Sequence, residues 1–420
     1  MTEHTKYILQ HVKISKMWGT HDISTSIGHI NLFIGYNGTG KTTFINIIEA
    51  VACCDVQSIL RLKFDQCSLF FSNGTEVVCT RFVDEDDDDI IEYSIVIDHE
   101  QIVPSFRFDA SISTPRARRI RFSEERYGAK PERVKAALSK IINISWVSVE
   151  RKQFFLHEYD NSDDIFRIGV DGKLDELVDA IQKYKSNIES EEKDLLDEFR
   201  KKVFELMLYD EKIDSIMDID RPRNDNWSVQ LKRAFHDLGI TSLDDKIKSH
   251  VRAVNEGFKL MANPKSNIKK SLDAFAVVTL YKRTMSIVDL SKKLESERQK
   301  IREHFEIYIS KLNSFINKKI SGIHEKTSEG DEWINASSLS SGEKQIVILL
   351  SEMLLHKNEN ILFIADEPEL SLHIDWQREI VGAIHELNKN AQLIFATHSP
   401  EVVSRWKPYV INMKTISSAL

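Results

Sequence analysis

The residues best suited to chemistry form a glycine-rich stretch near the start of the chain. It reads Gly35-Tyr36-Asn37-Gly38-Thr39-Gly40-Lys41-Thr42 and fits the spacing G-x-x-x-x-G-K-[ST]. Glycines let such a loop turn its backbone N–H groups around phosphate oxygens, and the following helix adds its positive dipole end. The sequence therefore predicts a nucleotide phosphate site. Its expected nucleotide-binding residues are Asn37, Gly38, Thr39, Gly40, Lys41, Thr42 and Thr43, with Lys41 between the β- and γ-phosphates and the Thr42 hydroxyl on Mg²⁺.

Two adjacent carboxylates, Asp366 and Glu367, follow the continuous apolar run Ile361–Ala365. Such a run is typical of a buried parallel strand, and α/β sheets bind ligands at the carboxyl ends of their strands. We expect Asp366 to hold Mg²⁺ and Glu367 to polarise the attacking water. His398 follows a second predicted strand, Gln392–Ala396, and we expect its ring to hydrogen-bond the γ-phosphate and sense hydrolysis.

A third element lies between these two, in the stretch Leu339-Ser340-Ser341-Gly342-Glu343-Lys344-Gln345. It precedes the apolar helix predicted for residues 346–355. Because a helix N-terminus attracts anions, Ser340 and Gly342 are predicted to form a second phosphate-binding element.

The elements that must position these residues follow from hydrophobic periodicity. Residues 7–14 and 29–35 are predicted strands, residues 42–52 a helix, and residues 144–151 another buried strand. Residues 68–97 are predicted to form a β-meander with a turn at Asn73–Gly74. Six acidic residues at its next tip, 84–89, could hold a divalent metal or be a solvated hairpin tip.

Helical spacing then replaces the strand pattern. Apolar residues recur at three- and four-residue steps over 174–206 and again over 290–315, which predicts either two long helices in a short antiparallel coiled coil or a plain helical subdomain. Pro222 and Pro264 should break the intervening part into shorter helices, and residues 322–330 are expected to form a loop. We therefore expect three parts, 1–155, 156–325 and 326–420, with the middle one inserted into an α/β domain.

Composition narrows the class of protein. The chain has 420 residues, a net charge of −8 and four cysteines without C-x-x-C spacing, which favours a globular protein of a reducing cytoplasm. No apolar run approaches the roughly 18 residues of a membrane span, so no membrane partner is expected. A basic stretch could contact nucleic acid or be ordinary surface charge; it contains Arg116, Arg118, Arg119, Arg121, Arg126, Lys130, Arg133 and Lys135.

The chain contains, in this order, the phosphate loop, the helical insertion and the stretches LSSGEKQ, DEPELSLH and THS. Together they resemble an ATP-binding-cassette (ABC) ATPase head of the SMC-like and OLD-like branch. The resemblance covers residues 1–150 and 325–410. It implies an α/β fold: a P-loop mixed sheet with an antiparallel β subdomain, interrupted by an α-helical, coiled-coil-like insertion. It also implies ATP and Mg²⁺ as ligands, with Glu367 and His398 as catalytic residues.

The family resemblance carries further expectations. Ser340 would contact the γ-phosphate held by another copy's P-loop, which implies a homodimer or higher homo-oligomer. Compact heads of this kind resemble the ATPase subunits of the PARIS and Septu antiphage systems, so we expect a separate effector, a nuclease, and a nucleic-acid or phage-protein trigger. Because few residues follow His398, no nuclease domain of its own is expected. The alternative is a DNA-repair or DNA-maintenance ATPase that binds duplex DNA.

Two positions depart from the family pattern, and two others are candidates for residues that the family uses. Ser341 replaces a usual glycine and Glu343 a frequent glutamine. Gln153 is a candidate for the family's Q-loop glutamine, and Trp18 for an aromatic ring that stacks on adenine.

Overall fold

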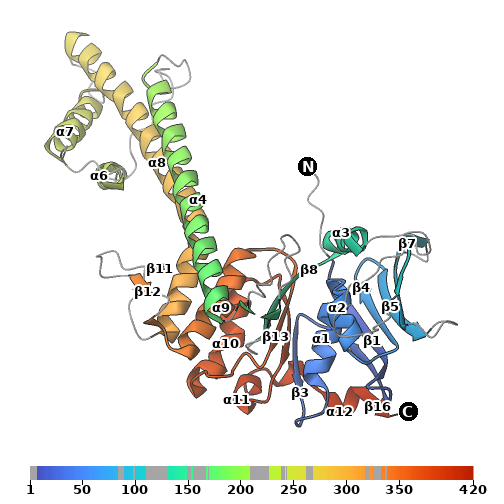
Figure 1. Ribbon diagram of the computed structural model, residues 1–420. Coiled ribbons are helices and arrows are strands. Elements are labelled where there is room, and N and C mark those ends of the chain that lie inside the picture. The colour runs from blue at the N-terminus through green and yellow to red at the C-terminus, as the bar shows by residue number, and fades with distance from the viewer. Residues whose placement is uncertain are drawn as a thin grey trace. The chain divides into compact units, whose positions relative to one another are not determined.

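The structure is a computed structural model, and it describes residues 7–83, 89–97, 100–109, 131–148, 153–154, 167–168, 170–208, 227–237, 242, 244–261, 268–316, 322–324, 333–335 and 338–419. The chain divides into two compact units. One comprises Met1–Ile181 and Ile307–Leu420, and the other Gln182–Glu306. Figure 1 shows the elements of each unit.

A five-stranded sheet forms the centre of the first unit. Its strands are all parallel, in the order β15 (Val410–Asn412), β3 (Ile30–Ile34), β14 (Gln392–Ala396), β13 (Ile361–Asp366) and β8 (Asn143–Ser148). Every residue of β13 and β14 is buried. The continuous apolar sequence of these strands is explained by this burial, because a parallel sheet is covered on both faces.

A second sheet of the same unit has seven antiparallel strands, in the order β16-β2-β1-β4-β5-β6-β7. Their bounds are β1 Leu9–Met17, β2 His21–Ser26, β4 Gln66–Phe71, β5 Thr75–Val83, β6 Asp89–Ile97, β7 Glu100–Asp109 and β16 Ser417–Ala419. The turn at Gly74 has a left-handed φ of 79°, a conformation that glycine adopts at little cost. The predicted meander is confirmed, including its pairing of β5 with β6.

Helix α1 (Lys41–Ala52) lies between the two sheets. It contacts β8, β13 and β14 on one side and β4 on the other, so one apolar core joins both sheets through it. Helices α9 (Ser341–Leu355) and α10 (Ile374–Leu387) pack on each other and lie on the opposite side of β13 from α1 (Figure 1).

Short elements complete the first unit. They are α2 (Val56–Arg61), α3 (Pro131–Ile141), β9 (Gln153–Phe154), β10 (Arg167–Ile168), β11 (Gly322–His324), β12 (Trp333–Asn335), α11 (Pro400–Val403), the 3₁₀ helix η3 (Lys407–Tyr409) and α12 (Met413–Ile416). The prediction of a loop across 322–330 is wrong at its start, because β11 pairs in parallel with β12 there. A three-residue strand is too short for periodicity to detect.

The second unit is helical. It contains the larger part of the long helices α4 (Val170–Glu205) and α8 (Ile268–Phe315), which run side by side in opposite directions (Figure 1). Glu192 of α4 accepts a hydrogen bond from Arg302 of α8 and forms an ion pair with Arg298 of the same helix. The shorter helices α6 (Trp227–Asp237) and α7 (Asp244–Met261) pack with α8 around Trp227, Val254 and Phe258.

The expected fold class is confirmed: an α/β domain with a P-loop sheet and an antiparallel β subdomain, interrupted by long helices. The P-loop sheet was expected to be mixed, whereas its described strands are all parallel. The antiparallel strands lie in the separate seven-stranded sheet. The compact helical unit comprises Gln182–Glu306, and the first three turns of α4 belong to the first unit. Every helix among the described residues is too short or too polar to span a bilayer.

Candidate functional site

The carboxyl ends of three neighbouring strands bring the predicted site residues to one edge of the parallel sheet. Phe33 of β3 lies opposite Ala396 of β14, which lies opposite Asp366 of β13. The chain stays hydrogen-bonded just beyond these ends: the Glu367 N–H donates to the carbonyl of Ala396 at 2.8 Å, and the Thr397 N–H to that of Phe33 at 3.0 Å. The phosphate loop, the two carboxylates and the His398 turn therefore all follow strands that end at the same edge of the sheet.

The phosphate loop has the backbone geometry that its glycines predict. Gly38 and Gly40 have left-handed φ angles of 79° and 88°, and Gly40 caps the N-terminus of α1. A Cβ at Gly40 would lie 2.7 Å from Cε of Met17 and 2.9 Å from the Trp18 ring. Only glycine fits here, because both the dihedral angle and the close approach exclude a side chain.

Lys41 is the buried cation of the loop. Its side chain is only 4% exposed, and Nζ donates hydrogen bonds to the carbonyls of Gly35 (2.9 Å) and Tyr36 (3.3 Å). Burial lowers the pKa of Lys41, whereas the negative charges of Glu367, Asp366 and Glu369 act in the opposite direction. An ammonium held in this way is a strong binding partner for phosphate oxygens.

Thr42 and Asp366 lie next to each other although they are far apart in the sequence. The Thr42 hydroxyl donates to Oδ1 of Asp366 at 3.3 Å. In the parts of the chain that the structure describes, no three His, Cys, Asp or Glu side chains converge to bind a metal. The donors nevertheless fit Mg²⁺, which is usually bound by one or two protein oxygens together with substrate phosphates and water. Thr42 and Asp366 are the residues that would hold it.

Glu367 and His398 face each other at the same edge. Nε2 of His398 lies 3.6 Å from Oε1 of Glu367. Glu367 has a left-handed φ of 46°, an unusual conformation for this residue type that is often found at functional sites. The structure thus brings together a carboxylate and an imidazole that the sequence predicts to act on one water and one phosphate.

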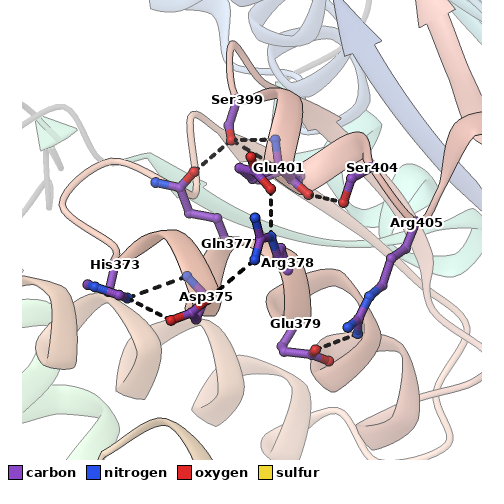
Figure 2. Close-up of polar contacts among 10 residues, drawn as sticks. His373, Asp375, Gln377, Arg378, Glu379, Ser399, Glu401, Ser404 and Arg405 are labelled. Carbon is purple, nitrogen blue, oxygen red and sulfur yellow. Dashed lines mark hydrogen bonds and ion pairs between the residues drawn. The ribbon is translucent and has the colours of Figure 1, made fainter.

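The turn that carries His398 is anchored from both sides. Oε1 of Glu369 accepts hydrogen bonds from Thr397 Oγ1 (2.6 Å), His398 N (2.9 Å) and Ser399 N (3.2 Å). The Ser399 hydroxyl donates to Oε1 of Gln377 at 2.6 Å, a contact visible in Figure 2. The sequence analysis missed Glu369 and Gln377 as site residues, because acids and amides near a strand end have no distinctive spacing.

Figure 2 also shows how α10 is joined to α11. Nε of Arg378 lies 2.6 Å from Oε2 of Glu401, and Arg378 also pairs with Asp375 at 3.4 Å. The Glu401 N–H donates to the Ser399 hydroxyl at 3.1 Å. Since Ser399 caps α11, the His398 turn is continuous with a helix that α10 holds in place.

Ser340 and Gly342 form the N-terminus of α9. Ser340 is the N-cap of the helix in a capping box: its hydroxyl accepts from the Glu343 N–H, and the Glu343 carboxylate accepts from the Ser340 N–H at 2.8 Å. A Cβ at Gly342 would lie 2.5 Å from the carbonyl oxygen of Ser371. This helix end therefore packs against the turn that follows Glu367, and the helix starts at Ser341, earlier than the predicted apolar run.

The remaining candidates have mixed outcomes. Trp18 has a left-handed φ of 60°, and its ring lies against Gly40 and is 39% exposed, so an aromatic face does border the phosphate loop. Gln153 begins the short strand β9. Residues 84–88 of the acidic tip and residues 116–130 of the basic stretch lie outside the described residues. Arg133 and Lys135 are exposed on α3.

The fold and the site define an ATPase of the AAA/ABC type. Residues 30–404 match the AAA_21 family, described as "AAA domain, putative AbiEii toxin, Type IV TA system", and the chain belongs to this family.

More specific likenesses are limited in extent. The chain is 34% identical over 80 residues to the "Retron Ec83 probable ATPase" of Escherichia coli, and the match covers 16% of this chain and 15% of that protein. The Smc head domain with an extended coiled coil from Pyrococcus furiosus, solved bound to the C-terminal domain of ScpA, is 13% identical with a TM-score of 0.41, over 99% of this chain and 96% of that one. The recombination mediator RecF is 10% identical with a TM-score of 0.31, over 95% of each chain.

Proposed function

We propose that the chain hydrolyses ATP with Mg²⁺ between two copies of its head, and that the nucleotide state controls a separate effector protein, a nuclease, in bacterial antiphage defence. The observation that carries the hydrolysis is the hydrogen bond between Thr42 and Asp366. It joins the phosphate loop to the strand that presents Glu367, so a bound triphosphate and a polarised water can meet at one edge of the sheet.

Each site residue has its own role in the proposed hydrolysis of ATP. Lys41 and the loop N–H groups hold the β- and γ-phosphates, and Mg²⁺ on Thr42 and Asp366 neutralises phosphate charge when bound. Glu367 accepts a hydrogen bond from water and takes its proton as the water oxygen attacks the γ-phosphorus. The bond to the β–γ bridging oxygen breaks, and its electron pair leaves on ADP. His398, beside Glu367, holds the γ-phosphate in line.

The homodimer rests on an incomplete site. The chain has one phosphate loop and one Ser340 element, and within the described residues Ser340 forms hydrogen bonds with Glu343 and Lys344 of its own helix. A helix N-terminus with an exposed serine is suited to bind an anion. We infer that this element of one copy contacts the γ-phosphate held by the other copy.

The role in defence rests on relatedness. The short match to a retron ATPase and the resemblance to the ATPase subunits of PARIS and Septu systems support a cytoplasmic regulator whose trigger is a nucleic acid or a phage protein. Such an assignment is an analogy at the level of the family. The effector would bind the chain rather than form part of it.

The test of hydrolysis is Glu367→Gln, with Glu379→Gln as the control because Glu379 lies on the outer surface of α10 in a pair with Arg405. We expect Glu367→Gln to bind ATP normally and to lose at least about 100-fold in turnover, since a general base supplies 10²–10⁴-fold. Phosphate release and fluorescent-ATP titration measure the two properties. If the parent shows no turnover at any protein concentration, the proposal is wrong.

DNA maintenance is the second candidate, and the basic stretch favours it. If the chain grips duplex DNA, changing Arg116, Arg118 and Arg119 to Ala should weaken binding and reduce its salt dependence. Duplex binding without any effect of a co-expressed nuclease partner would favour this candidate over defence.

A further inference from the structure

We propose that Glu369 is a positioning residue, whose buried carboxylate fixes the Thr397-His398-Ser399 turn so that the imidazole of His398 faces Glu367. This inference rests on the proposed ATP hydrolysis and adds a residue to its machinery. Glu369 acts through the backbone that carries His398.

The contacts of Glu369 are concentrated on one oxygen. Oε1 accepts three hydrogen bonds, from the Thr397 hydroxyl at 2.6 Å, the His398 N–H at 2.9 Å and the Ser399 N–H at 3.2 Å. Two successive backbone N–H groups that point at one oxygen form a nest, an arrangement that binds anions. Because one of them belongs to His398 itself, the carboxylate determines where the Cα of that histidine lies.

The burial of Glu369 makes these hydrogen bonds necessary. The residue is 8% exposed, and among the described residues no donor reaches its second oxygen, Oε2. A buried carboxylate with an unsatisfied oxygen costs free energy, so such a group contributes little net stability. A role in the site accounts for an acid at this position better than stability does.

The far side of the turn has a separate anchor. The Ser399 hydroxyl donates to Oε1 of Gln377 at 2.6 Å, and Nε2 of Gln377 donates to the carbonyl of Leu372 at 3.0 Å (Figure 2). Thr397 is held on the sheet through its N–H bond to Phe33. These anchors hold the two ends of the turn, Glu369 holds its middle, and the ring of His398 lies 3.6 Å from Oε1 of Glu367.

The size of the expected effect follows from geometry. A displacement of about 1 Å of a catalytic group can cost on the order of 100-fold in rate. Loss of the Glu369 carboxylate frees the turn, whereas Lys41 keeps its hydrogen bonds to Gly35 and Tyr36 and the larger effects of the Glu367 and Asp366 charges, and Thr42 keeps its bond to Asp366. The turnover number should therefore fall while the KM for ATP stays the same.

The experiment is a double-mutant cycle on kcat with Glu369→Ala and His398→Ala. We expect Glu369→Ala alone to lower kcat by about 10- to 100-fold with KM within twofold of the parent, and to cause no further loss in the His398→Ala background. An equal loss in both backgrounds overturns the inference, because Glu369 would then act independently of His398.

The conservative variant Glu369→Gln keeps an acceptor oxygen for the same three donors. It should retain more turnover than Glu369→Ala, and it supplies the test if the alanine variant does not fold. A glutamine variant that folds but is as slow as His398→Ala overturns the role of the hydrogen bonds. Glu379→Ala is the matched control for removal of an acid from this region.

A readout without turnover separates this inference from the proposed function. In protein labelled with ¹³C-histidine, the ring signal of His398 is the one missing from His398→Ala. We expect that signal to shift or broaden in Glu369→Ala and to stay in place in Glu379→Ala. An unchanged signal overturns the inference even if the protein is an ATPase, whereas a parent without turnover overturns the proposed function while this signal still tests Glu369.

Discussion

Lys41 has the most demanding environment of any residue in the site. Its ammonium is buried, which by itself favours the neutral form, but three carboxylates lie close enough to act against this. Burial lowers the pKa of Lys41 on balance, and we expect phosphate oxygens beside Nζ to favour its charged form, because an opposite charge nearby does so.

Replacing Lys41 by alanine should weaken ATP binding itself. We expect the Kd for ATP to rise at least about tenfold, or about 1.4 kcal/mol, because a charge-assisted hydrogen bond to phosphate is lost. Titration with a fluorescent ATP analogue measures this. Glu367→Gln should leave the Kd unchanged in the same assay, and equal affinities of Lys41→Ala and the parent would contradict the assignment.

At the scale of elements, α1 joins the two sheets and carries an unusual acid on its last turns. Burial, together with the nearby charge of Asp55, raises the pKa of Glu49 to about 7 from its ordinary value of 4.5. The folded chain therefore binds this proton more tightly than the unfolded chain does. The resulting stability is complete below about pH 4.5 and is lost as the pH rises through about 7.

Glu49→Gln should remove this pH dependence, since an amide is neutral throughout. Between pH 5 and pH 8 the free energy of unfolding of the parent should fall by about 2–3 kcal/mol more than that of the variant. Urea unfolding at the two pH values measures the difference. Glu379→Gln, at an exposed site, should behave as the parent does. The same change in the free energy of unfolding between the two pH values in all three proteins would refute the prediction.

The start of α4 is fixed to α9 by an ion pair between a half-buried lysine and a buried glutamate. Nζ of Lys173 lies 2.9 Å from Oε1 of Glu352, whose other oxygen accepts from the Ser145 hydroxyl of β8 at 3.0 Å. Tyr308 of α8 reaches the same helix through a 2.9 Å hydrogen bond with Ser351. Within the first unit, α4 and α8 are thus each attached to α9, whose N-cap is Ser340.

Lys173→Met should destabilise the chain by about 1–3 kcal/mol, because it leaves the buried Glu352 carboxylate without its cation. Lys185→Met is the control on the same helix, since Lys185 pairs at 4.0 Å with Glu189, whose side chain is 65% exposed, and it should cost less than about 0.5 kcal/mol. Urea unfolding compares them. Adding Glu352→Gln should recover part of the loss, and a further loss instead would contradict this explanation.

At the scale of the whole molecule, the proposed dimer needs a surface that surrounds the nucleotide. Leu370 and Ile374, in the turn after Glu367 and at the start of α10, are 50% and 48% exposed. They adjoin the N-terminus of α9, where Gly342 packs on Ser371 of the same turn. Large exposed apolar side chains beside a polar site are typical of surfaces that bind a partner.

Leu370→Asp should therefore weaken ATP-dependent dimerisation. In the Glu367→Gln background, which retains ATP, we expect the dimer Kd to rise at least about tenfold, because charged groups would be desolvated in the interface. Size-exclusion chromatography with light scattering measures it. Leu280→Asp, at a similarly exposed leucine of the helical unit, is the control, and equal effects of both changes would show that this surface is not the interface.

The sequence determined the parts of this protein that depend on neighbours along the chain. The phosphate loop could be predicted because strand, glycines, Lys41 and helix follow one another within a few residues, and the left-handed angles at Gly38 and Gly40 leave little choice of residue. The β5–β6 pairing, the long helices and the apolar strand before Asp366 were likewise predicted from periodicity. Tertiary structure alone decided which of these segments meet: β14 lies between β3 and β13, Thr42 meets Asp366, and Glu369 binds the turn of His398. Strand order and side-chain contacts between distant segments arise from packing and hydrogen bonding across the whole sheet, and no local pattern of residue types encodes them.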